Sequence, residues 1–135
     1  MVPKEYSHIL IQNNLEKSDE AISAAIVLLS NKLSSSALNR IYYAIFYTVS
    51  ALAEKHDFCT SKHITLMKWF NKKFVYEMKT IDEDMFIIYK KAFKFRQKND
   101  YDTLYKPTVE DAESLLNDAT LLINSLREII LGDVK

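Results

Sequence analysis

Arg40 is the first residue whose surroundings in the sequence point to chemistry. It lies in the mostly apolar stretch 37–55, and Tyr43 and Tyr47 follow it at three and seven residues, so on a helix all three share one face. One interpretation is an internal strut, a buried Arg bound to a carboxylate or to helix-end carbonyls, because unpaired buried charge is costly. The other is the wall of a cleft that binds phosphate or stacks a nucleobase.

A second polar cluster lies between residues 96 and 105. Arg96 and Asp100 are four residues apart, which suits an ion pair on one helix face, worth about 0.3–0.5 kcal/mol if exposed. The other members that could contact a phosphodiester are Lys98, Tyr101 and Tyr105. Because Tyr titrates near about pH 10 and Arg above about pH 12, this cluster lacks a good proton shuttle at neutral pH. It favours binding over turnover.

A third candidate is the start of a short periodic segment, residues 63–70. Thr60 or Ser61 can cap this helix, and Lys62 with His63 near its first turn would suit an anion held by free backbone N–H groups. The alternative is an ordinary capped helix start with solvated side chains. Both interpretations remain open from the sequence.

Composition decides the fold class. The chain has 135 residues with one Gly, two Pro and one Cys. Tight hairpins and phosphate-cradling loops need positive φ, so we expect an all-α protein with a single domain, 1–135. One cysteine, Cys59, excludes an intramolecular disulfide and fits a reducing cytoplasm. The histidines are not spaced as ligand pairs, so we expect neither a metal site nor a cofactor.

Hydrophobic periodicity predicts four long helices and one short one. Their expected ranges are 3–33, 37–55, 63–70, 81–98, and from 109 to a C-terminal cap at Gly132. Short connections make sequential helices antiparallel neighbours, so we expect an antiparallel four- to five-helix up-and-down bundle. The segment 37–55, apolar on nearly every side, should be its central helix. The buried stripe of the first helix is expected to be Ile22, Ala25, Ile26 and Leu29.

Local signals predict where the helices begin and end. The breaks are expected at the serines 34–36, in a basic connection 71–79 and in a loop 99–107. Thr80 and Glu83 have the spacing of a capping box, and Thr108 is expected to cap the last helix.

Charge is balanced overall but uneven along the chain. Residues 62–106 carry eleven basic and six acidic side chains, a net charge of plus five, although the whole chain is neutral. A basic middle section is either a footprint for a polyanion or a solvated helix face. No stretch approaches the roughly 18 apolar residues of a membrane-spanning helix, and no signal peptide is recognisable, so we expect a soluble protein.

Two motifs resemble those of the HEPN domain family. They are Asn-Arg-Ile-Tyr-Tyr-Ala-Ile-Phe-Tyr at 39–47 and Arg-Gln-Lys-Asn-Asp-Tyr at 96–101, with Ser-Lys-His at 61–63 between them. The resemblance covers nearly the whole chain and implies a helical bundle, usually a homodimer. It also implies a minimal nucleotidyltransferase as partner, in modules of toxin-antitoxin or defence type. Many such proteins are metal-independent ribonucleases that use an Arg followed, after four to six residues, by a His.

This chain departs from that catalytic pattern. The positions where the His would follow Arg96 hold Tyr101, Asp102 and Thr103. Three hypotheses follow. The first is a subunit with weak or no catalysis that binds a nucleotidyltransferase, a nucleotide or RNA through a cleft lined by Arg40, Lys62, Arg96 and Tyr101. The second is a ribonuclease in which Arg96 works with Tyr101 or His63. The third is a structural adaptor.

The resemblance further implies a tyrosine that accepts a nucleotide, Tyr101 or Tyr105.

Overall fold

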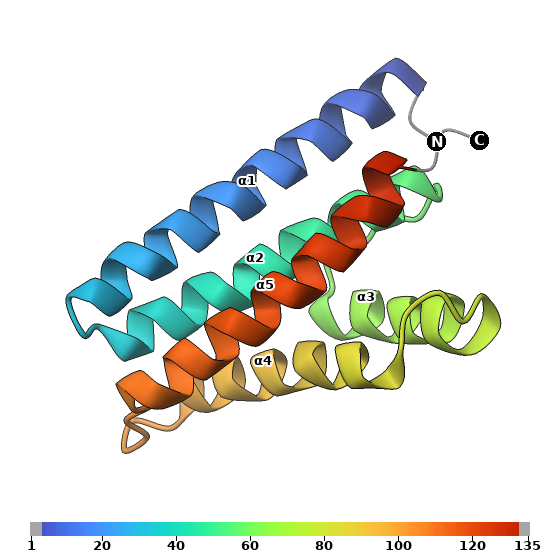
Figure 1. Cartoon of the computed structure of the whole chain (residues 1–135). Helices are drawn as coiled ribbons and strands as arrows, with labels where there is room; N and C mark the ends of the chain where they lie inside the picture. Colours follow the sequence, from blue (N-terminus) through green and yellow to red (C-terminus); the bar gives the residue numbers. More distant parts are fainter. Residues whose placement is uncertain (1–3, 133–135) are drawn as a thin grey trace.

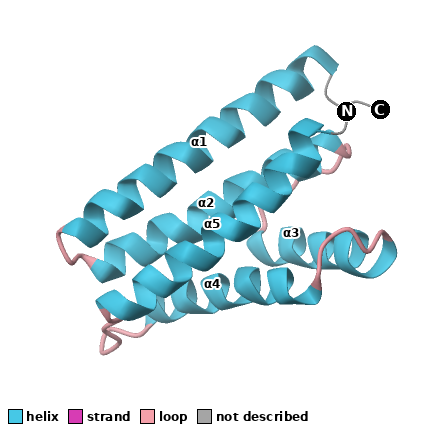
Figure 2. Cartoon of the chain, viewed as in Figure 1, coloured by secondary structure: helices cyan, strands magenta, loops and turns pink. Residues whose placement is uncertain are grey.

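The computed structural model describes residues 4–132, and within that range it holds helices and loops but no strand (Figure 2). The helical segments are α1 (Lys4–Ser30), α2 (Ser34–Lys55), α3 (His63–Phe70), the π-helix η1 (Asn71–Glu77), α4 (Glu83–Tyr101) and α5 (Val109–Gly132). The all-α prediction is confirmed. None of these helices combines the length and apolar character that a membrane-spanning segment requires.

The four long helices alternate in direction along the chain (Figure 1). α1 and α2 form an antiparallel hairpin, α4 runs back across the bundle, and α5 returns beside α2 in the same direction as α2. α3 and η1 form a short arm beside the start of α4. This is the up-and-down bundle that the short connections predict.

α2 lies at the centre of the core, as its apolar sequence predicts. It packs against α1, α3, α4 and α5, and Leu38, Ile41 and Ile45 on it are fully buried. A polar contact joins it to α1, because the buried Ser18 hydroxyl lies 2.7 Å from the Thr48 hydroxyl and donates to the Ala44 carbonyl. Buried hydroxyls that are paired in this way avoid the penalty of an unmet hydrogen bond.

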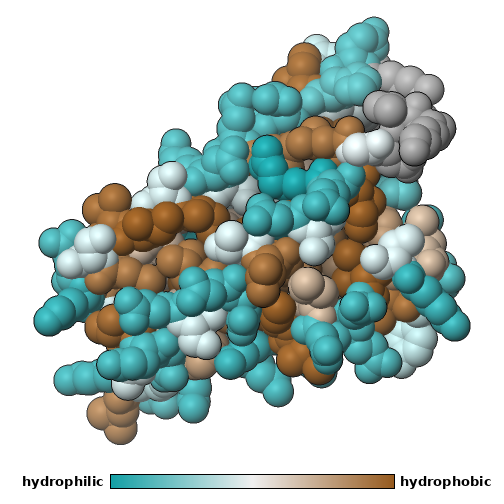
Figure 3. Space-filling view, in the orientation of Figure 1, coloured by the Kyte–Doolittle hydropathy of each residue, from teal (hydrophilic) through white to brown (hydrophobic). Residues whose placement is uncertain are grey.

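The expected break at residues 34–36 is wrong, because α2 already begins at Ser34, with Leu33 at its N-cap and no side-chain capping bond. The expected stripe of α1 is wrong at one position: Ala25 and Leu29 are buried, but Ile26 is 51% exposed. α1 is covered on one side only, so this position faces outward. Figure 3 shows hydrophobic patches separated by hydrophilic side chains on one face of the molecule.

The expected basic connection at 71–79 is mostly the π-helix η1. The Met78 N–H donates to the Lys73 carbonyl at 2.8 Å, a step of five residues rather than four. This wider turn lets Phe74 follow Phe70 into the core, where the two stacked rings have centroids 5.9 Å apart.

Both ends of α4 differ from the prediction. The helix begins at Glu83 with Asp82 at its N-cap and no side-chain capping bond, so the expected capping box of Thr80 is wrong. It continues through residues 99–101, which were expected to be loop. Asn99 supports this extension, because its Nδ2 donates to the Ser35 carbonyl at 2.8 Å and its Oδ1 accepts from the Ser35 hydroxyl.

α5 follows the sequence closely. The Asp111 N–H donates to Thr108 Oγ1 at 3.0 Å, so the predicted cap is confirmed. The apolar periodicity of α5 predicts one buried stripe, and the structure shows every member of it buried or packed against the core: Val109, Ala112, Leu115, Leu116, Ala119, Leu122, Ile123, Leu126, Ile129 and Ile130. Gly132, expected as a C-terminal cap, is the last helical residue that the structure describes; residues beyond it lie outside the described range.

Candidate functional site

Two arginines from different helices contact the ring of Tyr43. The Arg40 Cζ atom, on α2, lies 5.2 Å from the centroid of this ring, and the Arg96 Cζ atom, on α4, lies 5.5 Å from it. Both distances fall within the range of cation–π contacts. We call Arg40, Tyr43 and Arg96 the two-arginine cluster. The structure therefore brings together two cations that are far apart in the sequence.

Arg96 contacts Tyr42 and Asp100, and its two Nη atoms are left for a ligand. Its guanidinium also lies over the Tyr42 ring at 5.2 Å, and its Nε atom lies 3.3 Å from Asp100 Oδ2. The predicted ion pair is confirmed, although the Nε atom has no partner with hydrogen-bond geometry. The side chains of Arg96 and Asp100 are 19% and 34% exposed. Neither Nη atom of Arg96 bonds to a residue within 4–132, so these donors can serve a ligand.

Arg40 carries an uncompensated charge. Its Nε and Nη2 atoms donate to the neighbouring Asn39 Oδ1 at 3.3 and 3.0 Å. No acidic side chain in the described part of the chain forms an ion pair with it. The amide fixes the orientation of the guanidinium but does not neutralise it. Arg40 thus resembles a preorganised cation rather than an internal strut.

His63 joins the cluster from the start of α3. Its ring centroid lies 5.8 Å from that of Tyr43, and it stacks on the Phe46 ring at 4.3 Å. The Tyr42 hydroxyl lies 2.6 Å from His63 Nδ1. Burial, and secondarily the Arg96 cation, lower the pKa of His63 below its usual 6.5, whereas burial raises the pKa of Tyr42.

These contacts assign a protonation state to the pair. A lowered pKa keeps His63 neutral near pH 7, and a raised pKa keeps the Tyr42 hydroxyl protonated. The Nδ1 atom is the hydroxyl's partner, so the phenol donates to Nδ1 and the imidazole proton sits on Nε2. His63 therefore offers one N–H donor beside the two-arginine cluster.

Tyr47 extends the cluster along α2. Its ring centroid lies 5.9 Å from that of Tyr43, and the Lys17 ammonium of α1 lies 5.7 Å from the Tyr47 ring. Lys17 was not among the predicted site residues. It adds a third cation near the row of tyrosine rings.

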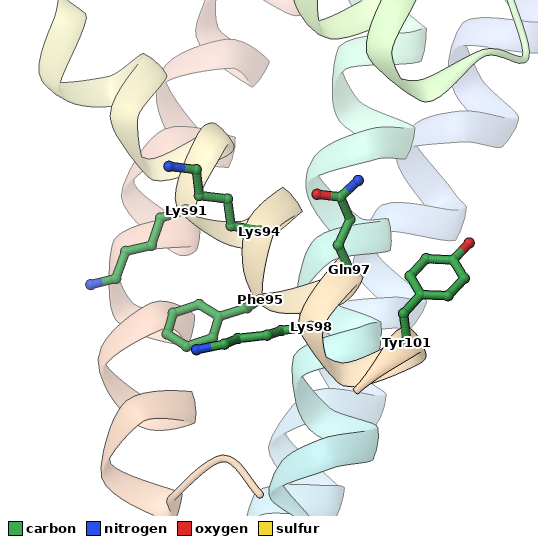
Figure 4. A pocket seen from close by; sticks show the side chains of 6 residues that line it. All are labelled: Lys91, Lys94, Phe95, Gln97, Lys98 and Tyr101. Atoms are coloured by element: carbon green, nitrogen blue, oxygen red, sulfur yellow. The ribbon is translucent and has the colours of Figure 1, made fainter. Parts of the chain in front are cut away.

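Four other predicted residues lie apart from this cluster, and three of them lie at or after the end of α4. Lys98 and Tyr101 line a shallow hollow along α4, together with Lys91, Lys94, Phe95 and Gln97 (Figure 4). Tyr101 is 80% exposed, and five residues along a helix turn it about 140° away from Arg96. The Lys98 ammonium lies 5.1 Å from the Tyr105 ring, whose buried hydroxyl has no partner within residues 4–132. Burial, and then Asp111, raise the pKa of Tyr105.

Lys62 is the N-cap residue of α3 and is exposed. Its backbone N–H donates to Thr60 Oγ1 at 3.1 Å, so Thr60 supports the turn before α3 without capping the helix itself. The Lys62 side chain makes no contact with the two-arginine cluster in the described structure.

Comparison with known proteins bears directly on this arrangement. Residues 11–129, which include every candidate site residue, match the sequence model of the HEPN domain. The chain belongs to the HEPN domain family. It is 37% identical over 120 residues to a Methanocaldococcus jannaschii protein named as a putative toxin, covering 89% of this chain and 88% of that one.

Two further relatives cover a similar share of this HEPN chain. A second M. jannaschii protein named as a putative toxin is 28% identical over 122 residues, or 90% of this chain and 82% of the relative. A UPF0332 protein of Thermotoga maritima is 32% identical over 114 residues, or 84% of this chain and 86% of the relative. These matches support one fold across the set.

Sequence reasoning missed Tyr42, although it is central to the HEPN chain's site. Its ring lies under Arg96 and its hydroxyl holds His63. A signal was present, because a fully buried tyrosine in a core helix needs a partner for its hydroxyl where phenylalanine would not. Asn39 and Phe46, which orient Arg40 and stack on His63, carried no such signal.

The donor set of this HEPN chain suits an anion. Two guanidiniums and the His63 ring all contact Tyr43, and the only carboxylate that pairs with either arginine among residues 4–132 is Asp100. The same described range holds no group of three or more His, Cys, Asp or Glu side chains placed to bind a metal ion. A guanidinium can donate two parallel hydrogen bonds to phosphate oxygens, and a nucleobase can stack on a tyrosine ring.

Proposed function

We propose that this HEPN protein is a toxin-type subunit that binds RNA or a nucleotide through the two-arginine cluster. The observation that carries the proposal is the convergence of Arg40 and Arg96 on one tyrosine ring. The open Nη donors of Arg96 would bind a phosphate, and the tyrosine rings would stack a neighbouring base. The toxin names of two relatives support the class.

The proposal includes partners and a location. We place the protein in the cytoplasm as a homodimer that pairs with a minimal nucleotidyltransferase, as the family resemblance implies. Tyr101, with 80% of its surface exposed, is accessible to such an enzyme, whereas Tyr105 has a buried hydroxyl. Between the two tyrosines that could accept a nucleotide, exposure favours Tyr101.

Binding of labelled single-stranded RNA and of ATP to the wild type, Arg96→Ala and Arg127→Ala tests the proposal. Arg127 is a matched control, because it lies on α5 and pairs with Asp19 at 3.4 Å. We expect Arg96→Ala alone to lose at least tenfold in affinity. Equal retention of ligand by the two variants, or no binding by the wild type, would contradict the proposal.

His63 favours a second candidate function, a metal-independent ribonuclease. Its neutral ring beside Arg96 offers the proton acceptor that Arg96 and Tyr101 cannot supply. For this role the His63 ring would take its other tautomer, in which Nδ1–H donates to the Tyr42 hydroxyl oxygen and Nε2 is free. Nε2 would then take the 2′-hydroxyl proton as the 2′-oxygen attacks phosphorus. The bond to the 5′-oxygen then breaks, water protonates that oxygen, and Arg96 stabilises the added negative charge.

Cleavage of labelled RNA in the presence of a chelator tests this second function. Activity in the wild type that is lost in both Arg96→Ala and His63→Asn, but kept in Tyr101→Phe, would support it. RNA binding without cleavage would leave the protein as a binding subunit.

A further inference from the structure

A cavity outside the two-arginine cluster lies near the end of α2. It has a volume of about 280 Å³ and opens between α1, α2 and the loop before α3. Its wall includes Asn14, Phe46, Ser50, Glu54, Phe58 and Thr60. This volume lies just below the roughly 300–1,000 Å³ typical of pockets for drug-sized ligands, so it suits a small group such as one nucleobase.

Glu54 is the most unusual residue in this wall. It is only 9% exposed, yet its carboxyl group makes no hydrogen bond or ion pair with any residue in the described chain. Most of the side chain is covered, but the carboxyl oxygens are not among the buried polar atoms, so they reach the open space of the cavity. A carboxylate that lines a cavity and has no protein donor is available to a ligand that brings hydrogen-bond donors.

Two aromatic rings make the cavity suitable for a flat ligand. Phe46 is stacked on His63 at 4.3 Å, and Phe58 is stacked on Trp69 at 4.9 Å with only 2° between the ring planes. Each ring is therefore held by a neighbour outside the cavity wall. Held aromatic rings are the usual surfaces on which unpaired bases stack.

The cavity adjoins the two-arginine cluster. Phe46 belongs to both places, since it lines the cavity and contacts Tyr43 at 6.0 Å between ring centroids. Along α2, Ser50 follows Tyr43 by seven residues, or about 10 Å. A phosphate on the arginines and a base in the cavity would thus belong to the same nucleotide or to adjacent ones.

We propose that this cavity is a guanine pocket in which the Glu54 carboxylate reads the base. Guanine alone among the common bases presents two adjacent donors, N1–H and the 2-amino group, on its Watson–Crick edge. Adenine would turn its N1 acceptor toward the carboxylate, and uracil offers a single N–H between two carbonyls. Asn14 and Thr60 supply donors for guanine's acceptor atoms. This inference rests on the proposed function for the phosphate contact, but not for the base contact.

Free nucleosides test the base contact alone, because they carry no phosphate. In NMR titrations, guanosine should shift the amide signals of Glu54, Phe58 and Thr60, whereas inosine, which lacks the 2-amino group, should bind at least fivefold more weakly. Glu54→Gln should remove the difference between the two nucleosides. Glu128→Gln, which changes an exposed carboxyl on α5, is the matched control and should keep it. Equal shifts by guanosine, inosine and adenosine would overturn the inference.

A second arm separates free nucleotide from RNA and this inference from the proposed function. GMP, AMP and single-stranded oligonucleotides with one central G or A are titrated into the wild type, Glu54→Gln and Arg96→Ala. We expect a G preference of at least fivefold that Glu54→Gln abolishes while binding of the A ligands persists. If the G and A oligonucleotides bind equally and their binding depends on Arg96, the assignment of a guanine pocket is wrong, whereas the proposed function is supported. If guanosine binds but no phosphate-bearing ligand depends on Arg96, the proposed function is wrong and the pocket stands.

Discussion

Replacement of Asp100 by asparagine is expected to tighten RNA binding and to weaken the fold at the same time. Asp100 lies 3.3 Å from Arg96 Nε with both side chains partly exposed, so the pair contributes about 0.2–1 kcal/mol. A phosphate on the open Nη atoms of Arg96 leaves this pair at Nε in place. It meets a repulsion of about 0.5 kcal/mol from the carboxylate charge roughly 8 Å away in water. Removing this repulsion should tighten binding by about twofold.

The stability change has the opposite sign. Loss of an i, i+4 pair lowers the free energy of unfolding by about 0.3–0.5 kcal/mol, which corresponds to roughly 1–3 °C in Tm for a domain of this size. Fluorescence anisotropy with a labelled single-stranded RNA and thermal melting by circular dichroism measure the two quantities. Asp118→Asn is the control, because Asp118 on α5 forms no ion pair with a described residue. Unchanged or weaker RNA binding by Asp100→Asn would show that the Asp100 carboxylate does not oppose a phosphate on Arg96.

Three other predictions concern the interior. An NMR titration should give His63 a pKa below 6.5. Tyr42→Phe removes the partner of His63 Nδ1 and should raise that pKa. The same His63 pKa in the wild type and in Tyr42→Phe would argue against the assigned hydrogen bond. Because the folded pKa is the lower one, the unfolded chain binds this proton more tightly. The free energy of unfolding should therefore fall as the pH drops from 6.5 toward the folded pKa, and urea titrations of His63→Asn should lack that part of the fall. Ser18→Ala removes a buried hydroxyl that contacts Thr48 and should lower the free energy of unfolding in urea by about 1–2 kcal/mol. The control Ser23→Ala, on the exposed face of α1, should leave it unchanged. Equal urea midpoints for the two variants would contradict the role of the buried hydroxyl pair.

The long helices were predictable because their signals are local. In α5 the apolar side chains recur every three or four residues, and Thr108 carries a hydroxyl at the capping position. Both signals can be read without knowing what the helix packs against. Sequence and structure therefore agree from the Thr108 cap to Ile130.

The π-helix η1 was not predictable on the same grounds. Its polar residues Asn71, Lys72, Lys73 and Glu77 are typical of a connection, although Phe70 and Phe74 are four residues apart. The structure is decided by packing, because Phe74 and Val75 must both reach the core after Phe70. Tertiary contacts of this kind leave no local pattern in the sequence.

The candidate site was predictable in part. The spacing of Arg40 to Tyr43 is local, so the sequence placed this cation and this ring together. The approach of Arg96 depends on how α4 crosses α2, and the approach of His63 depends on the loop between α2 and α3. Neither follows from spacing. Tyr101 shows the converse, because its nearness to Arg96 in sequence places it on another side of α4.

The salt dependence of RNA binding shows whether Arg40 and Arg96 both contact phosphate. The affinity of the wild type, Arg40→Ala, Arg96→Ala and Arg127→Ala for one single-stranded RNA is measured over a range of salt concentrations. If both arginines of the cluster contact phosphate, each of their variants should lower the slope of log K against log salt by about 0.7, and Arg127→Ala should leave it unchanged. Identical slopes for all four proteins would contradict the account.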